Sequence, residues 1–213
     1  MQLAAIMAAG LVGAWSASAS ISVTLNSVNP SEAVQVNGNW LYAGVYNLTV
    51  DGLATPSFCI DVAHGFDVGA TATDYNYVPL ASAPNNPNGP MGAAAAHWIS
   101  GLWGTYYTPG ITQSDAAALQ VAIWMAVSQG DQAPALSIGN ASLETAAAGM
   151  LSNVQADSGI TYAQLFGLVG SAGADEQGFV VPVPEPTTVI AGLLLLLPLG
   201  ASTLRIVRKN RLA

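Results

Sequence analysis

Two residues of this chain have side chains whose chemistry needs an explanation. Cys59, the single cysteine, lies in the short apolar run 58–62, which predicts a strand. Gln120 borders the apolar stripe of a predicted helix. An amide that is buried there without a partner costs about 1–3 kcal/mol, so we expect Gln120 to find a hydrogen-bond partner inside the fold. The stripe itself repeats every three or four residues and consists of Ala116, Leu119, Ile123 and Val127.

The segments around these two residues resemble a known pair of motifs. Phe-Cys-Ile-Asp at 58–61 and Gln-Val-Ala-Ile-Trp at 120–124 are similar to the two halves of the Cys–Gln thioester domains of bacterial surface adhesins. In that family the glutamine belongs to a Thr-Gln-x-Ala motif, and Leu119 stands here in place of the threonine. The resemblance covers roughly residues 40–127.

The resemblance implies a covalent site. The Cys59 thiolate would displace ammonia from the Gln120 carboxamide and leave an internal thioester, which an amine or hydroxyl on a target molecule can open. A fold supplies the required proximity as effective concentration, without a catalytic triad. The alternative from the residues alone is that Cys59 is a small buried apolar residue and Gln120 a hydrogen-bonded helix residue.

The histidines are the other candidates for catalysis or metal binding. His64 lies between Asp61 and Asp67, but the chain has neither an HExxH nor a CxxC spacing, so a solvated His64 at a strand end is the simpler interpretation. His97 lies in a predicted helix and is expected to pack there. The aspartates, Asp74 included, lack the spacing of a calcium loop. We therefore expect no metal, no cofactor and no enzymatic activity.

The densest aromatic group offers a non-covalent alternative. Aromatic rings stack on sugar rings, so an exposed group of this kind would bind extracellular polysaccharide. The competing interpretation is a hydrophobic core between helices and sheet. The group consists of Trp98, Trp103, Tyr106 and Tyr107.

The charges of the chain are separated by position. All four cations lie at 205–211, whereas the twelve acidic residues precede them. A body without a cation cannot neutralise phosphates, which argues against nucleic-acid binding and against binding of anionic lipid headgroups.

The C-terminal region combines three features in a fixed order. Pro184, Glu185 and Pro186 precede a predicted transmembrane helix at 187–204, and a basic tail at 205–213 would stay cytoplasmic. This tail resembles the PEP-CTERM sorting signal of Gram-negative bacteria. The resemblance implies that an exosortase recognises and processes it.

The N-terminal end predicts export. Residues 1–19 have the apolar stretch and the Ala-Ser-Ala ending of a signal peptide, to be removed by signal peptidase. We expect a precursor anchored in the inner membrane and a mature form at the cell surface or in the extracellular matrix. A lone thiol in such an oxidising compartment needs a protective arrangement.

The remaining chain predicts one α+β domain at 20–170, followed by a linker at 171–186. We expect an antiparallel β-sandwich or barrel packed against a small helical subdomain. Strands are predicted at 21–25, 40–50 and 58–62, with turns at Asn37-Gly38 and Asp51-Gly52. Helices are predicted at 91–102, from a cap at Ser114 or Asp115 to about Ser128, and at 143–154.

Together these features predict an adhesion or matrix protein sorted through a PEP-CTERM signal, with an internal thioester for covalent attachment. The alternative is a non-covalent structural or polysaccharide-binding matrix protein with an inert Cys59.

Overall fold

The computed structural model describes residues 20–85, 89–129, 136–171 and 176–183. The predicted signal peptide, the Pro-Glu-Pro motif, the predicted membrane helix at 187–204 and the basic tail lie outside these residues. Within the described ranges, no helix has both the length and the hydropathy needed to cross a membrane.

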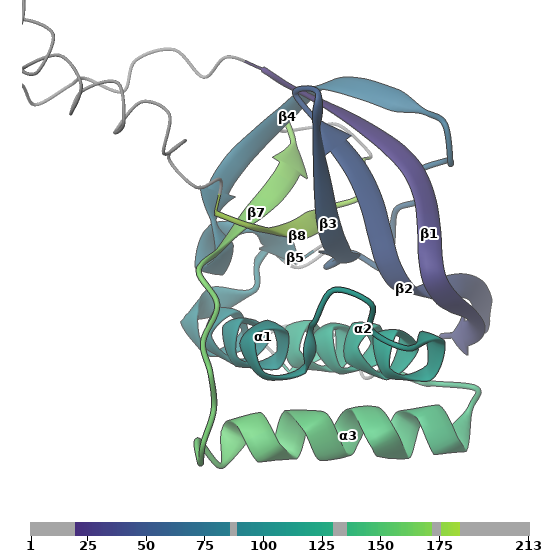
Figure 1. The fold of residues 1–213 in the computed structure, drawn as a ribbon, viewed down its shortest axis with the longest axis vertical. Helices are drawn as coiled ribbons and strands as arrows, with labels where there is room; N and C mark the ends of the chain where they lie inside the picture. Colours follow the sequence, from purple (N-terminus) through teal and green to yellow (C-terminus); the bar gives the residue numbers. More distant parts are fainter. Residues whose placement is uncertain (1–19, 86–88, 130–135, 172–175, 184–213) are drawn as a thin grey trace, which may run out of the picture.

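A closed β-barrel forms the upper part of the molecule (Figure 1). Its strands follow the order β1-β2-β3-β8-β7-β4, and every neighbouring pair is antiparallel. Closure is made by short stretches of pairing, since β1 pairs with β4 over residues 21–24 and β3 pairs with β8 at Phe58 and Cys59. The strands are β1 Ile21–Val36, β2 Asn39–Val50, β3 Leu53–Cys59, β4 Thr71–Pro79, β7 Leu165–Gly170 and β8 Phe179–Pro182. A single-turn helix, η1 Leu80–Ser82, and a ribbon of β5 Pro84–Asn85 with β6 Gly89–Pro90 connect the barrel to the helices.

The first three strands form a meander held by two tight turns. Asn37 and Gly38 both have positive φ, at 51° and 84°, and Asp51 and Gly52 have 48° and 83°. Positive φ at both central residues is the requirement of a two-residue hairpin turn. The turns predicted from the sequence are therefore confirmed, although β1 extends far beyond the predicted 21–25.

Three helices follow, α1 Gly92–Tyr106, α2 Gln113–Ser128 and α3 Ala141–Gln155. The predicted cap of α2 at Ser114 or Asp115 is wrong. Thr112 caps this helix, because its hydroxyl oxygen accepts a hydrogen bond from the Asp115 backbone N–H at 3.2 Å. Asn140 caps α3 in the same way through the Leu143 N–H.

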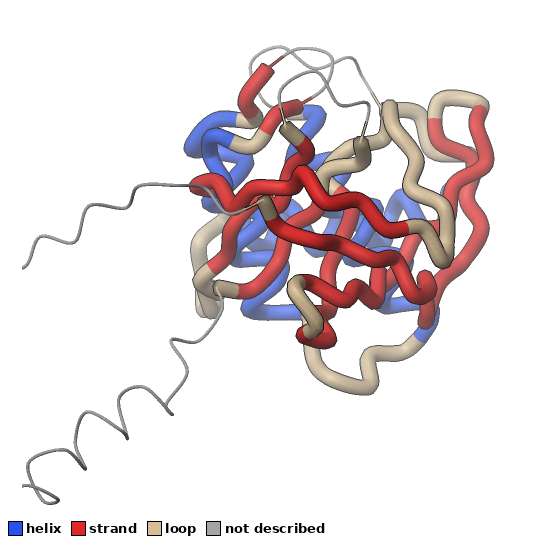
Figure 2. Tube along the Cα trace, turned by 90° about the horizontal axis from the view of Figure 1, so that it is seen from above, coloured by secondary structure: helices blue, strands red, loops and turns tan. Residues whose placement is uncertain are grey.

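The helices lie in two layers below the barrel, with α1 and α2 next to the strands and α3 outside them (Figure 1). Seen from above, the strands lie in front of the helices (Figure 2). Because α2 has the barrel on one side and α3 on the other, it is buried along almost its whole length, from Ala116 to Trp124 and again at Ala126 and Val127. The single predicted stripe was therefore too narrow.

The chain after residue 170 is not only a linker. β8 inserts between β3 and β7, and Phe179, Val180 and Val181 are fully buried. The predicted linker at 171–186 is wrong for this part, because these apolar side chains complete the core and their backbone closes the barrel. The prediction of a mixed α+β body with an antiparallel sheet and helices is confirmed.

Candidate functional site

Cys59 is the last residue of β3, and β2 no longer pairs with β3 at this position. β2 pairs with β3 only as far as Ser57, whereas β8 pairs with Phe58 and Cys59. Ile60 donates its backbone N–H to Gly178 next to β8, at 3.0 Å. Because successive residues of a strand direct their N–H and C=O groups to opposite edges, those of Cys59 face away from β8.

The side-chain amide of Gln120 takes the place of β2 as the hydrogen-bond partner of Cys59. Its Oε1 accepts from the Cys59 backbone N–H at 2.9 Å, and its Nε2 donates to the Cys59 carbonyl at 2.8 Å. Both residues are 0% exposed. The partner expected for the Gln120 amide is therefore the Cys59 main chain, 61 residues away in the sequence. The structure brings the two residues together, and the covalent bond between them stays a prediction.

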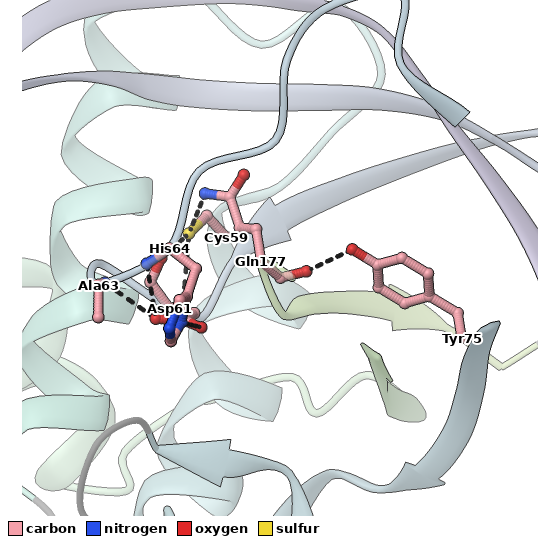
Figure 3. Close-up of polar contacts among 6 residues, drawn as sticks. All are labelled: Cys59, Asp61, Ala63, His64, Tyr75 and Gln177. Atoms are coloured by element: carbon pink, nitrogen blue, oxygen red, sulfur yellow. Dashed lines mark hydrogen bonds and ion pairs between the residues drawn. The ribbon is translucent and has the colours of Figure 1, made fainter. Parts of the chain in front are cut away.

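The Cys59 sulfur lies in a shell of hydrogen-bonding groups (Figure 3). Its S–H donates to the Asp61 carbonyl at 2.8 Å, and the sulfur accepts from the Asp61 N–H at 3.3 Å. Gln177 Nε2 donates to the sulfur at 2.9 Å, while the Gln177 carbonyl accepts from the Tyr75 hydroxyl at 2.8 Å. Sequence reasoning missed Gln177, because it lies in the stretch interpreted as a linker and has no motif around it.

Burial has the largest effect on the pKa of the Cys59 thiol. Desolvation raises the pKa of Cys59 to about 12, although the Trp124 indole, the Asp61 backbone and Gln177 act in the opposite direction. The Trp124 Nε1–H is buried and finds no hydrogen-bond partner of acceptable geometry among the described residues. At neutral pH the group is therefore a thiol, shielded from solvent.

Asp61 and His64 form a turn beside the sulfur. Asp61 Oδ1 accepts from the backbone N–H groups of Ala63 at 2.9 Å and His64 at 3.3 Å, and Asp61 Oδ2 contacts His64 Nδ1 at 2.7 Å. The expectation of a solvated His64 is wrong, because its side chain is only 24% exposed and is paired with Asp61. Over the described ranges, no three potential ligands from His, Cys, Asp or Glu cluster as a metal site would require.

His97 is exposed on α1 and packs against a neighbouring ring, not into the core. Its ring stacks on that of Tyr162, with the centroids 4.6 Å apart.

The aromatic group considered for sugar stacking is part of the core. Trp103 is buried and meets Phe58 edge-on, with ring centroids 5.2 Å apart. Tyr107 contacts both of these rings, and Trp98 and Tyr106 are half-buried against the same core. The four side chains therefore form no exposed platform. Trp103 and Tyr107 cover Phe58, the strand residue next to Cys59, and help to exclude water from it.

Comparison of the chain with protein-family models, with curated proteins and with solved structures gives no match. A carboxamide is held against the Cys59 main chain in a dry interior, and two N–H groups donate to the Cys59 sulfur.

Proposed function

We propose that this protein is an exported surface or matrix adhesin in which Cys59 and Gln120 form an internal thioester for covalent attachment to a target. The observation that carries the proposal is the two-point hydrogen bonding of the Gln120 amide to Cys59. It fixes one particular carboxamide against the main chain of the residue that carries the only thiol of the chain. Such fixed proximity is the main requirement for an uncatalysed intramolecular acyl transfer.

The reaction balances without a cofactor. The Cys59 sulfur attacks the Gln120 side-chain carbonyl carbon, the C–N bond breaks, and ammonia leaves with the thiol proton. An amine or hydroxyl of the target later attacks the same carbon, the C–S bond breaks, and the thiol is restored. Burial of both residues protects the thioester from hydrolysis until the site opens.

The proposed route to the surface rests on the two ends of the chain. Signal peptidase would remove residues 1–19, the helix at 187–204 would hold the precursor in the inner membrane, and an exosortase would recognise Pro184, Glu185 and Pro186. The absence of Lys and Arg before residue 205 fits a body that faces outward. Deleting residues 184–186 should retain the protein in the membrane fraction, whereas the unaltered protein should reach the surface; equal surface display of both would contradict this route.

The thioester is tested by intact mass. Wild-type protein should be lighter than its sequence by one ammonia, and methylamine should add its own mass and release one titratable thiol. Cys59→Ser and Gln120→Ala should each have their full mass, whereas Gln155→Ala, an exposed glutamine on α3, should keep the deficit. A wild-type protein of full mass would rule out the covalent function.

A second candidate function, non-covalent binding of extracellular polysaccharide, is favoured by a different surface. Trp40 is 71% and Tyr42 61% exposed, and both lie on the same face of β2. Exposed aromatic faces stack on sugars. In this case Cys59 would be inert and Gln120 would only complete the strand edge. Replacing both aromatics by alanine should abolish retardation of the protein in polysaccharide-containing gels, and unchanged retardation would exclude this surface.

A further inference from the structure

The groups around the Cys59 sulfur are mostly donors. Gln177 Nε2–H and the Asp61 backbone N–H both donate to the sulfur, at 2.9 and 3.3 Å. Gln177 is 6% exposed, and its backbone carbonyl is fixed by the Tyr75 hydroxyl. A neutral thiol needs few donors, since sulfur is a weak acceptor. A thiolate in the same dry site would use all of them.

Trp124 adds an unused donor. It lies one helical turn after Gln120 on α2, it is 2% exposed, and its indole N–H has no hydrogen-bond partner among the described residues. A buried N–H group without a partner costs about 1–3 kcal/mol, so its presence needs a reason. The indole also lowers the pKa of Cys59, against the larger effect of burial.

We propose that Gln177 and Trp124 are catalytic residues of the thioester site, whose N–H groups stabilise the negative charge on the Cys59 sulfur while the bond forms and while it opens. The inference rests on the proposed function and adds two residues to it. It gives a role to the Gln177 amide and the Trp124 indole, neither of which becomes part of the thioester.

Negative charge develops on the Cys59 sulfur both when the thioester forms and when it opens. When the bond forms, the sulfur attacks the Gln120 carbon as a thiolate, and its proton leaves with the ammonia. When an amine opens the bond, the electron pair of the C–S bond returns to the sulfur, which then takes up the proton lost by the amine. Because the site excludes water, only protein donors can stabilise this anion.

Gln177 acts here as a donor and not as the acyl group. It presents its amide nitrogen to the sulfur, whereas Gln120 holds both atoms of its amide against the Cys59 main chain. The opposite assignment makes a distinct prediction. A mass deficit that survives in Gln120→Ala and disappears in Gln177→Met would identify Gln177 as the acyl partner and overturn the proposal.

The test compares rates of opening by methylamine, followed by intact mass. Gln177→Met keeps the length of the side chain and removes the N–H donor. Trp124→Phe keeps one aromatic ring and removes the indole ring that carries the N–H. Each should slow opening by about 10-fold or more, in line with the loss of one buried donor at a charged centre. Gln155→Met, on the exposed face of α3, is the matched control and should open at the wild-type rate.

The outcomes separate this inference from the proposed function. A wild-type protein without the mass deficit contradicts the proposed function itself. A folded Gln177→Met or Trp124→Phe protein that carries the deficit and opens at the wild-type rate contradicts only the donor role. The thiol released by methylamine gives a further readout, because a single cysteine produces a single S–H stretching band. Gln177→Met should shift this band and Gln155→Met should not; an unshifted band in Gln177→Met would disprove the contact.

Discussion

The side-chain amide of Gln120 replaces a β-strand next to Cys59. It supplies one acceptor and one donor, at 2.9 and 2.8 Å, to backbone groups that β2 no longer reaches. The contact satisfies a buried strand end and holds a carboxamide against the Cys59 main chain. Under the proposed function, stability and chemistry would be coupled at this site, and variants of Gln120 should reveal both.

Gln120→Leu should destabilise the protein by about 2–4 kcal/mol, because it leaves the buried N–H and C=O of Cys59 without partners. Gln120→Glu should be less harmful at low pH, since a protonated carboxyl group can donate to the Cys59 carbonyl and an ionised one cannot. Denaturant unfolding at two pH values measures both effects. Gln155→Leu, on the surface, should change little; equal stability of the Leu variants at 120 and 155 would contradict the strand-replacing role.

The Cys59 thiol should resist alkylation in the folded protein well above neutral pH. Burial raises its pKa to about 12, so the reactive thiolate is scarce and inaccessible. Unfolding in denaturant should expose one thiol per chain if no thioester is present, and none before methylamine treatment if the bond has formed. Rapid alkylation of the native protein at neutral pH would show that the site is open.

Glu176 should make the protein less stable as pH rises. Desolvation, followed by the neighbouring Asp74, raises the pKa of Glu176 above its ordinary value of 4.5. The folded state then holds a proton that the unfolded state has lost, so stability falls as pH rises from about the ordinary pKa through the raised one. Glu176→Gln should flatten this pH dependence and raise the melting temperature at neutral pH. An unchanged pH profile in the variant would contradict the assignment.

Two helical glycines should respond to alanine in opposite ways. A Cβ on Gly104 of α1 would lie 2.2 Å from the Thr161 carbonyl oxygen, so Gly104→Ala should cost about 1–3 kcal/mol through a backbone clash. Gly149 of α3 has no atom within 4 Å of such a Cβ, so Gly149→Ala should stabilise by about 0.5–1 kcal/mol. Thermal unfolding of the two variants gives the comparison, and destabilisation by both would show that helix propensity is not the controlling factor.

Truncation should locate the end of the folded body. Removing residues 187–213 should leave a cooperatively unfolding protein, because the last strand of the barrel ends at Pro182. Ending the chain at residue 175 should abolish cooperative unfolding, since it removes β8 with its buried Phe179, Val180 and Val181. Circular dichroism during heating distinguishes the two. A stable fold in the shorter protein would mean that β8 is dispensable.

The sequence predicted the local features well, because they depend on neighbouring residues. Two hairpin turns with Asn-Gly and Asp-Gly, the three helices and the need of Gln120 for a partner all follow from short-range chemistry. β8 could not be predicted in this way. Its buried residues are consecutive rather than alternating, and its role depends on pairing with β3, far away along the chain.

The same limit applies to the candidate site. Cys59 and Gln120 were found through their motifs, whereas Gln177 and its contact with the sulfur arise only when β8 closes the barrel. The aromatic residues illustrate the converse difficulty. A group such as Trp103 and Tyr107 has the same composition whether it faces solvent or the core, and only packing decides between these arrangements.

The position of β8 also sets the timing of folding. β1 is the first strand of the barrel and β8 the last, so the barrel can close only after synthesis has passed residue 182 and, in an exported protein, after that residue has been translocated. Until then Gln177 is absent from the sulfur and the pocket around Cys59 is incomplete. Under the proposed function, the site around Cys59 would therefore be completed only after β8 has paired, which would keep its chemistry silent while the chain is still in transit.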